Sequence, residues 1–346
     1  MLPTRLTDNM LVHISSNNEV LSMFRQTPAG DGVWDGVRFV AEDPDLQADW
    51  FIGFDETARD CKTKVPLERR ILFLTEPPTI KYYPRHFLKQ FGHLVCSVVP
   101  STAEGPATIS SCGLPWMYGL YQKPVPMPWQ RLVAGSQVAK TGEISVVCST
   151  KKMNLNQHRR LRFLGMLKEA LGDRLTFFGR GSNPIEDKSD AINSFRYHLV
   201  LENNLIDNGW TEKLADPILG GAFPIVSGGE NLAEYFDPAG FRLIDTRKPR
   251  AAVEAVLKIL DEDPFPSAQV AMADNKRRLM MQHQFFPIAV NVIRTLEAQE
   301  AVAPVQLETP AAFRTAAKPK WKKIASVPRP LRPVLRDLYL TVAERG

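Results

Sequence analysis

The chain has 346 residues, of which 44% are hydrophobic and 23% are charged, and its formal net charge is +5. This composition is typical of a soluble globular protein and excludes a low-complexity chain, while the length suits two domains of ordinary size. No apolar run reaches the roughly eighteen residues that a membrane span needs, and the N-terminus lacks the apolar core of a secretory signal.

The cysteines indicate the compartment. Cys61, Cys96, Cys112 and Cys148 are scattered, without a CxxC pair or a regular spacing. They are typical of free thiols in a reducing compartment and do not indicate a disulfide framework or a zinc site. We therefore expect a cytoplasmic protein.

The positive charge is concentrated at the C-terminus. From Arg314 to Gly346 nine Lys and Arg residues face only Asp337 and Glu344, a local net charge of +7 that leaves −2 for the rest of the chain. We therefore predict no nucleic-acid-binding core. The segment 314–346 reads as a partly disordered basic tail, and we predict peripheral contact with an anionic membrane, at the inner face of the cell membrane. A solvated basic tail is the alternative.

The first half of the chain predicts strands separated by short connections. The expected strands cover 10–16, 37–43, 49–55, 69–76 and 93–99, with a helix over 83–91. Residues 100–129 are rich in Pro, Gly and Ser and are typical of a linker or of site loops.

The second half shows the clearer alternation. The expected strands cover 143–150, 175–180, 197–203, 222–228 and 241–245, and the expected helices cover 157–173, 189–195, 211–221, 231–236 and 250–260. Near-continuous apolar strands separated by helices indicate a parallel sheet covered on both faces. After residue 290 the pattern decays into an extended tail with a short helix over 334–344. We predict domains 1–135 and 136–300, followed by a tail over 301–346.

One helix start carries candidate binding residues. Thr211 is a good N-cap, which places Glu212 and Lys213 in the first turn. The positive end of a helix favours phosphate, Lys213 adds a full charge, and a carboxylate such as Glu212 can accept hydrogen bonds from ribose hydroxyls. A capped surface helix with a solvated Glu–Lys pair is the alternative on local spacing alone.

The surrounding sequence resembles the donor-binding region of family 10 glycosyltransferases, the α1,3-fucosyltransferases. The resemblance rests on four ordered matches over about fifty residues: the run from Tyr197 to Asn203, Thr211-Glu212-Lys213, Pro224-Ile225-Val226 and Ile244-Asp245. It covers roughly residues 143–245. The resemblance implies the GT-B fold: an α/β protein of two Rossmann-like domains with parallel sheets facing a cleft, the nucleotide on the C-terminal one.

The resemblance also implies roles for single residues. Lys213 and Arg160 would bind the diphosphate of GDP, Glu212 the ribose, and Asn203 would shape the pocket; Arg159 and Arg162 compete with Arg160 for this role. Glu202 and Trp210 are further candidates for the donor pocket. The family tyrosine before x-Thr-Glu-Lys is Gly209 here, and Trp210 is its possible substitute. Pro217 should kink its helix or start it afresh.

A second candidate position follows a buried strand in the first half. Glu76 comes after the apolar run Leu72-Phe73-Leu74 and precedes Pro77 and Pro78, where open α/β sheets place ligands. This segment resembles the Glu-Ser-Pro segment of the fucosyltransferases, whose Glu looks like the general base. A carboxylate that caps a neighbouring loop is the alternative.

The resemblance implies a metal-independent, inverting transfer of fucose from GDP-fucose to a hydroxyl of a glycan, such as a bacterial surface glycan, with Glu76 as base and no cofactor. No histidine spacing or Asp-x-Asp element predicts a metal site. Two alternatives remain open. The same fold can use another nucleotide sugar, or the chain is a non-catalytic protein that binds a glycan or a nucleotide.

Overall fold

The computed structural model describes residues 10–17, 21–41, 43, 46–59, 61–148, 155–179, 183–299 and 311–313. The chain forms two compact units: unit 1 comprises Met1–Gly113 and Phe285–Gly346, and unit 2 comprises Leu114–Gln284. The predicted boundaries, 135/136 and 300/301, differ from this division at both ends. The basic tail 314–346 and its predicted membrane contact lie outside the described residues.

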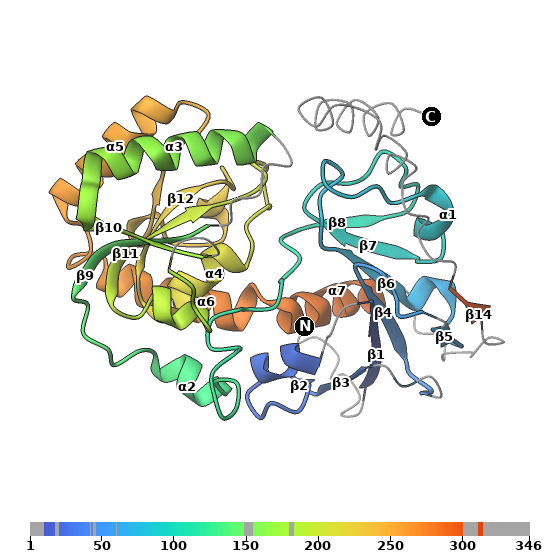
Figure 1. The fold of residues 1–346 in the computed structure, drawn as a ribbon. Helices are drawn as coiled ribbons and strands as arrows, with labels where there is room; N and C mark the ends of the chain where they lie inside the picture. Colours follow the sequence, from blue (N-terminus) through green and yellow to red (C-terminus); the bar gives the residue numbers. More distant parts are fainter. Residues whose placement is uncertain are drawn as a thin grey trace. The chain divides into compact units, whose positions relative to one another are not determined.

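Unit 1 contains a seven-stranded sheet in the order β2-β3-β1-β4-β6-β7-β8 (Figure 1). Its strands are parallel except β2, which pairs with β3 in the antiparallel sense. They are β1 Met10–Ser16, β2 Val33–Trp34, β3 Val37–Ala41, β4 Trp50–Phe54, β6 Arg70–Leu74, β7 His93–Cys96 and β8 Ala107–Ile109. Unit 1 also contains helix α1, Arg85–Leu88, and the short antiparallel pair β5 Lys62–Thr63 and β14 Ala311–Ala312.

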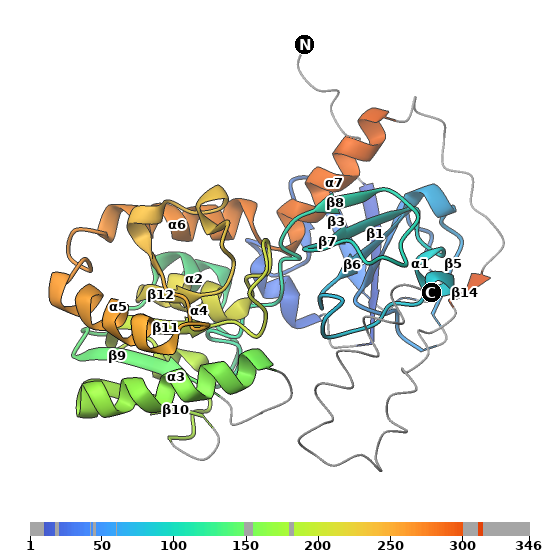
Figure 2. The ribbon, with the colours of Figure 1, turned by 90° about the horizontal axis from the view of Figure 1, so that it is seen from above.

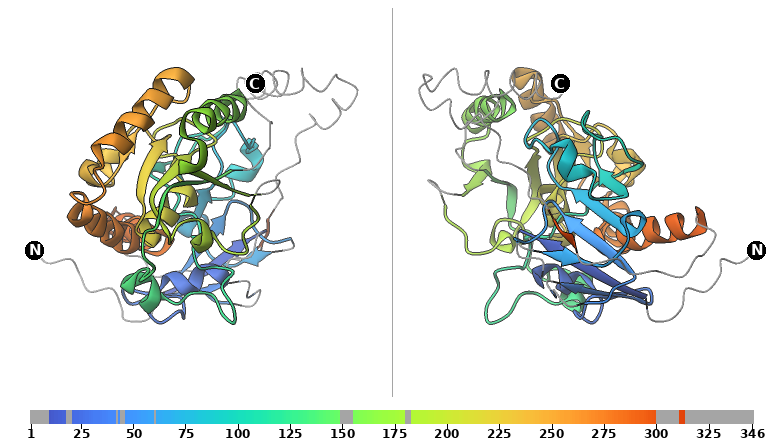
Figure 3. Two further views of the ribbon diagram at one scale, coloured as in Figure 1. Left: turned by 60° about the vertical axis from the view of Figure 1, so that its left-hand side comes forward. Right: turned by 90° about the vertical axis from the view of Figure 1, so that its right-hand side faces the viewer.

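Helix α7, Phe285–Gln299, packs on the sheet of unit 1 (Figure 3, right). The ring of Phe285 lies 5.0 Å from that of Phe73 and 5.4 Å from that of Phe54. At the far end, Glu297 accepts a hydrogen bond from the indole of Trp50. The prediction of extended structure directly after residue 290 is therefore wrong, because α7 continues to Gln299. The prediction that residues 285–300 belong to the second domain is also wrong, because this segment belongs to unit 1. The aromatic pair at the start of the helix belongs to the core of unit 1.

Unit 2 contains a five-stranded parallel sheet in the order β10-β9-β11-β12-β13. Its strands are β9 Gly142–Val147, β10 Leu175–Phe178, β11 Phe195–Leu201, β12 Phe223–Ser227 and β13 Arg242–Leu243. Its helices are α2 Trp129–Ala134, α3 Leu155–Leu171, α4 Glu212–Gly220, α5 Pro249–Glu262 and α6 Gln269–Gln282. The prediction of two Rossmann-like α/β domains with parallel sheets is confirmed. That they face a cleft stays a prediction.

The core of unit 2 follows from the alternation along its strands. Tyr197, Leu199 and Leu201 point to the face that α3 and α5 cover, and these two helices lie side by side (Figures 1 and 2). His198 lies on the other face, where its Nδ1 is 2.8 Å from the hydroxyl of Ser145. Burial lowers the pKa of His198 to about 3, which fits a neutral core histidine.

The segment from Leu114 to Lys123 belongs to unit 2 because two buried carboxylates hold its backbone. Asp216 of α4 accepts hydrogen bonds from the N–H groups of Met117 (3.0 Å) and Tyr118 (2.9 Å). Asp187 accepts from Gly119 (2.9 Å) and Tyr121 (2.8 Å). Unit 2 therefore begins at Leu114, and not after residue 135 as predicted. The sequence alone does not show the hydrogen bonds that Asp187 and Asp216 accept from this segment.

Two of the expected helices form only short 3-10 turns. Residues 189–195 form only the 3-10 turn Lys188–Ala191, which begins with a capping box of Asp187 and Asp190 and ends before β11 starts at Phe195. Residues 231–236 form the 3-10 turn Leu232–Glu234. Helix α4 continues through Pro217 to Gly220 as one element, so it does not start afresh there.

Candidate functional site

The candidate donor site lies at the topological switch point of unit 2. In the order β10-β9-β11, the chain leaves β9 toward β10 and then returns to the opposite side of β9 as β11. Ligands of open α/β sheets bind at the carboxyl ends of the strands at such a point. Cys148 follows β9, Glu202 and Asn203 follow β11, and the N-terminus of α4 comes next along the chain.

The N-terminus of α4 has the predicted cap. Thr211 has extended backbone, and its hydroxyl accepts a hydrogen bond from the N–H of Lys213 at 3.3 Å. The buried carboxylate of Glu202 in turn accepts from the Thr211 N–H (2.8 Å) and hydroxyl (2.9 Å). This double contact fixes the first turn of α4 on the end of β11. A side chain on Gly228 would collide with Glu202, because a Cβ there would lie 2.6 Å from the Glu202 Cβ.

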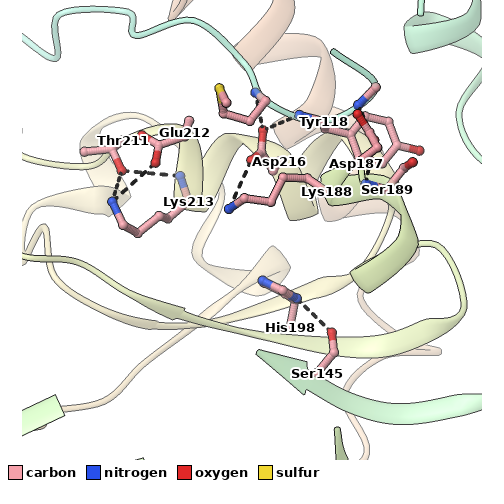
Figure 4. Close-up of polar contacts among 12 residues, drawn as sticks. Tyr118, Ser145, Asp187, Lys188, Ser189, His198, Thr211, Glu212, Lys213 and Asp216 are labelled. Carbon is pink, nitrogen blue, oxygen red and sulfur yellow. Dashed lines mark hydrogen bonds and ion pairs between the residues drawn. The ribbon is translucent and has the colours of Figure 1, made fainter. Parts of the chain in front are cut away.

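Lys213 lies between the carboxylates of Glu202 and Glu212; Figure 4 shows its contacts with Thr211 and Glu212. Its Nζ is 3.4 Å from Glu202 Oε2 and 3.4 Å from Glu212 Oε1, and 3.1 Å from the Thr211 hydroxyl. Burial alone would lower the pKa of Lys213, but the two carboxylates outweigh it and hold that pKa above its usual range. Burial likewise opposes the ionisation of Glu212, but Lys213 and Lys188 hold its pKa below the usual range. The ammonium of Lys213 is therefore held in a fixed position, and the partly exposed carboxylate of Glu212 lies beside it.

Burial has the opposite outcome at Glu202. It raises the pKa of Glu202 above the usual range, while Lys213 and the Thr211 hydroxyl act against it. Glu202 is therefore the inner, structural carboxylate of the pair, and Glu212 is the outer one that a ligand can reach.

Arg160 of α3 is the second cation at this edge. It is buried, and its Nη1 donates a hydrogen bond to Asn203 Oδ1 at 2.9 Å. Of the competing arginines, Arg162 is exposed and Arg159 is half-buried. Burial raises the pKa of the Cys148 thiol, and both Arg160 and Lys213 oppose this shift. The structure thus gathers Arg160, Asn203 and Lys213 around one strand end.

Trp210 is buried in an aromatic cluster. Its ring packs edge-on against Tyr235 (5.7 Å) and Phe236 (5.3 Å), and within the described residues its indole N–H has no hydrogen-bond partner. Gly209 offers no side chain to the site. The proposed substitution of the family tyrosine by Trp210 stays a prediction.

Sequence reasoning missed the polar groups one turn along α4. Asp216 is fully buried, and its Oδ2 lies 3.8 Å from Lys188 Nζ (Figure 4). Burial raises the pKa of Asp216 to about 7, against Lys188 and the two backbone N–H donors. The signal was present in the sequence: Asp216 is a charged residue inside the apolar stretch Leu214–Leu219.

In unit 1, Glu76 follows β6 and is exposed, as expected for a residue that contacts a ligand. Its N–H donates to the hydroxyl of Tyr83 at 3.4 Å, and that hydroxyl donates to Asp55 Oδ1 at 2.6 Å. Lys81 also reaches Asp55, at 2.7 Å. The sequence had pointed to Glu76 alone; Asp55 follows the buried strand β4 by the same rule.

In the part of the chain that the structure describes, no group of three or more His, Cys, Asp or Glu residues is arranged to hold a metal ion. Metal independence stays a prediction. Among the same residues, no helix combines the length and the apolar character needed to cross a membrane.

Residues 138–266 match the model of glycosyltransferase family 10 (fucosyltransferase), C-terminal domain. The structure of an alpha1,3-fucosyltransferase with GDP-fucose matches with a TM-score of 0.49 and 13% identity, over 88% of this chain and 94% of that one. The structure of an alpha1,3-fucosyltransferase with GDP matches with a TM-score of 0.47 and 14% identity, over 84% of this chain and 90% of that one. The structure of WaaG, a glycosyltransferase involved in lipopolysaccharide biosynthesis, matches with a TM-score of 0.40 and 13% identity, over 83% of this chain and 100% of that one. No curated protein matches the sequence.

Proposed function

Because residues 138–266 belong to glycosyltransferase family 10, we propose that this chain transfers fucose from GDP-fucose to a hydroxyl of a glycan acceptor. The observation that carries the proposal is the pair of cations, Arg160 and Lys213, at the switch point of unit 2. Lys213 lies 3.4 Å from Glu202 and Arg160 lies 2.9 Å from Asn203, the two residues that directly follow β11, so both cations lie at the carboxyl end of that strand.

The donor would bind through its diphosphate. Lys213 supplies a charge that two carboxylates hold in position, and Arg160 supplies donors that the Asn203 amide orients. As the bond between the sugar and the diphosphate breaks, negative charge grows on GDP. Fixed cations stabilise such charge without reorganising at the moment of reaction. Glu212, the outer carboxylate, would accept hydrogen bonds from the ribose hydroxyls.

Glu76 would act as the general base. It would remove the proton of the acceptor hydroxyl while the oxygen of that hydroxyl attacks the anomeric carbon from the face opposite GDP. The new glycosidic bond forms as the bond to the diphosphate oxygen breaks, and GDP leaves with the electron pair. The configuration at the anomeric carbon inverts. No step in this scheme needs a metal ion or another cofactor.

The test of the base is Glu76→Gln, which keeps the shape of the side chain and removes its basicity. We expect turnover to fall at least ~100-fold, the lower end for general base catalysis. GDP affinity should be nearly unchanged, because the proposed GDP ligands belong to unit 2. The measurement is sugar transfer at saturating donor, beside calorimetric titration with GDP. Transfer within a few-fold of wild type would assign the base elsewhere.

A second candidate function is transfer of another sugar. The observation that favours it is Gly209, which has no side chain where the family has a tyrosine, while Trp210 packs into its own aromatic cluster. Heat unfolding in the presence of GDP-fucose, GDP-mannose and UDP-sugars separates the two. A ligand at ~100 times its dissociation constant adds about 2.7 kcal/mol of apparent stability. Protection by a UDP-sugar and none by GDP-fucose would replace the donor proposed above. Protection without turnover would favour a non-catalytic binding protein.

The site of action is proposed on sequence alone. We place the chain in the cytoplasm, with the basic segment 314–346 in contact with the anionic inner face of the cell membrane.

A further inference from the structure

A polar network of Asp55, Tyr83 and Lys81 contacts the backbone of Glu76 at the carboxyl edge of the unit 1 sheet. This sheet also has a switch point, between β1 and β4, because the chain leaves β1 toward β3 and returns on the other side as β4. Asp55 follows β4 directly at this point. Phe54 pairs with Phe73 of the neighbouring strand β6, and Glu76 follows that strand. Asp55 and Glu76 therefore leave adjacent strands at the same edge.

Asp55 holds an unusual conformation in order to reach this network. Its φ is 67°, in the left-handed region that costs most residues roughly 1 kcal/mol or more. Its backbone N–H still donates to Phe73, so the turn begins on a regular ladder. The side chain is buried and accepts hydrogen bonds from Tyr83 (2.6 Å) and Lys81 (2.7 Å).

The loop after Glu76 folds back so that Tyr83 returns beside it. The N–H groups of Ile80 and Lys81 both donate to the carbonyl of Pro77, at 2.8 and 3.1 Å, which closes a turn. The ring of Tyr83 is 1% exposed and packs in the core cluster that contains Phe87. The side chain of Tyr83 is therefore held at two points: its ring packs in the core, and its hydroxyl contacts Asp55.

The Tyr83 hydroxyl links the two strand ends. It donates to Asp55 Oδ1 and accepts the N–H of Glu76 at 3.4 Å. Burial raises the pKa of Tyr83 well above its usual value, and the charges of Asp55 and Glu76 act in the same direction. The phenol stays protonated and keeps donating to Asp55. Lys81 offsets part of the negative charge, because its ammonium lies 2.7 Å from Asp55 and 2.6 Å from Glu56.

We propose that Asp55 and Tyr83 are a positioning pair for Glu76: Asp55 orients the phenol, and the phenol holds the backbone from which the base projects. This inference rests on the proposed role of Glu76. It adds two residues that do not touch the reacting atoms and yet set the rate of the chemical step.

The first test needs no activity. Tyr83→Phe removes one oxygen and leaves the ring in the core. We expect faster amide hydrogen exchange in the peptide that covers residues 75–82. Tyr197→Phe in unit 2 is the matched control, because the buried hydroxyl of Tyr197 also donates to a carboxylate, Asp263, and accepts a backbone N–H, that of Phe265. Exchange in 75–82 that is unchanged by Tyr83→Phe would overturn the proposal.

The second test is a double-mutant cycle on GDP release from GDP-fucose, with lactose or water as the hydroxyl source. We expect Tyr83→Phe to lower kcat about 10-fold with the donor KM unchanged, and Tyr197→Phe to leave both unchanged. In the Glu76→Gln background, Tyr83→Phe should have no further effect, because a positioning residue acts only through the group that it positions. Equal losses in both backgrounds would overturn the proposal.

The outcomes separate this inference from the proposed function. If Glu76→Gln retains turnover, the assignment of the base is wrong, and the positioning role is wrong with it. If Glu76→Gln lowers turnover as expected and Tyr83→Phe lowers it by the same factor in both backgrounds, the base stands and only the positioning pair is wrong. If GDP-fucose is not a donor, hydrogen exchange still tests the contact between Tyr83 and the backbone of Glu76.

Discussion

The ammonium of Lys213 has two carboxylate neighbours at 3.4 Å before any ligand binds. A diphosphate that reaches it gains a charge-assisted hydrogen bond, worth typically ~1.5–3 kcal/mol. We therefore expect Lys213→Ala to weaken GDP binding about 10- to 150-fold in a calorimetric titration. Guanosine, which has no phosphate, should bind both proteins equally.

Lys168→Ala is the matched control for the lost charge. Lys168 lies at the far end of α3, where it donates to the carbonyl of Gly172. Its removal should leave GDP affinity unchanged. An unaltered GDP dissociation constant in folded Lys213→Ala would remove this lysine from the donor site, and an equal loss for guanosine would show that the variant damages the pocket rather than a phosphate contact.

Single residues were predictable from sequence where the signal was local. Thr211, Glu212 and Lys213 are consecutive, so the cap and the first turn could be predicted together. The contact between Asp55 and Tyr83 was not predictable, because it joins residues 28 positions apart that only the pairing of β4 with β6 brings together. The same holds for Arg160 and Asn203, which the family resemblance suggested and the spacing did not.

At the scale of elements, α4 connects two functions. Its first turn carries Glu212 and Lys213, and one turn later Asp216 holds the backbone of Met117 and Tyr118. The folded state raises the pKa of Asp216 to about 7 from the usual 3.8, so it binds the proton more tightly than the unfolded chain does. The tighter binding of this proton stabilises the folded state. This contribution to the free energy of unfolding is complete below about pH 4 and is lost as the pH rises through 7.

This linkage gives a pH-dependent prediction for Asp216→Asn. The amide imitates the protonated acid and still offers an oxygen to the two N–H groups, while Lys188 loses its ionic partner. The melting temperature of the variant relative to wild type should rise as the pH increases from 5 to 8, by an amount equivalent to a few kcal/mol at most. Thermal unfolding of both proteins across this range is the measurement. A difference that is constant with pH would contradict the assigned shift.

Elements were predicted well where apolar runs were long. Strands β1, β6 and β9 to β12 start within two residues of the expected ranges. Strands β1, β6, β11 and β12 are almost wholly buried, whereas β10 is mostly half-buried. Helix α6 was not expected, since polar residues interrupt its apolar positions. Residues 189–195 had a helical composition, but they form only a 3-10 turn that ends at Ala191, and β11 begins at Phe195.

For the whole molecule, the chain crosses between the units twice, at Gly113–Leu114 and at Gln284–Phe285. Unit 2 is continuous in sequence, whereas unit 1 is completed only by α7, whose Phe285 packs on Phe54 and Phe73. On the ribosome, all of unit 2 is therefore synthesised before helix α7 of unit 1. Domains usually acquire their structure in order from the N-terminus during synthesis. Here the first unit to be translated must wait, with its aromatic sheet face uncovered, until the second has emerged.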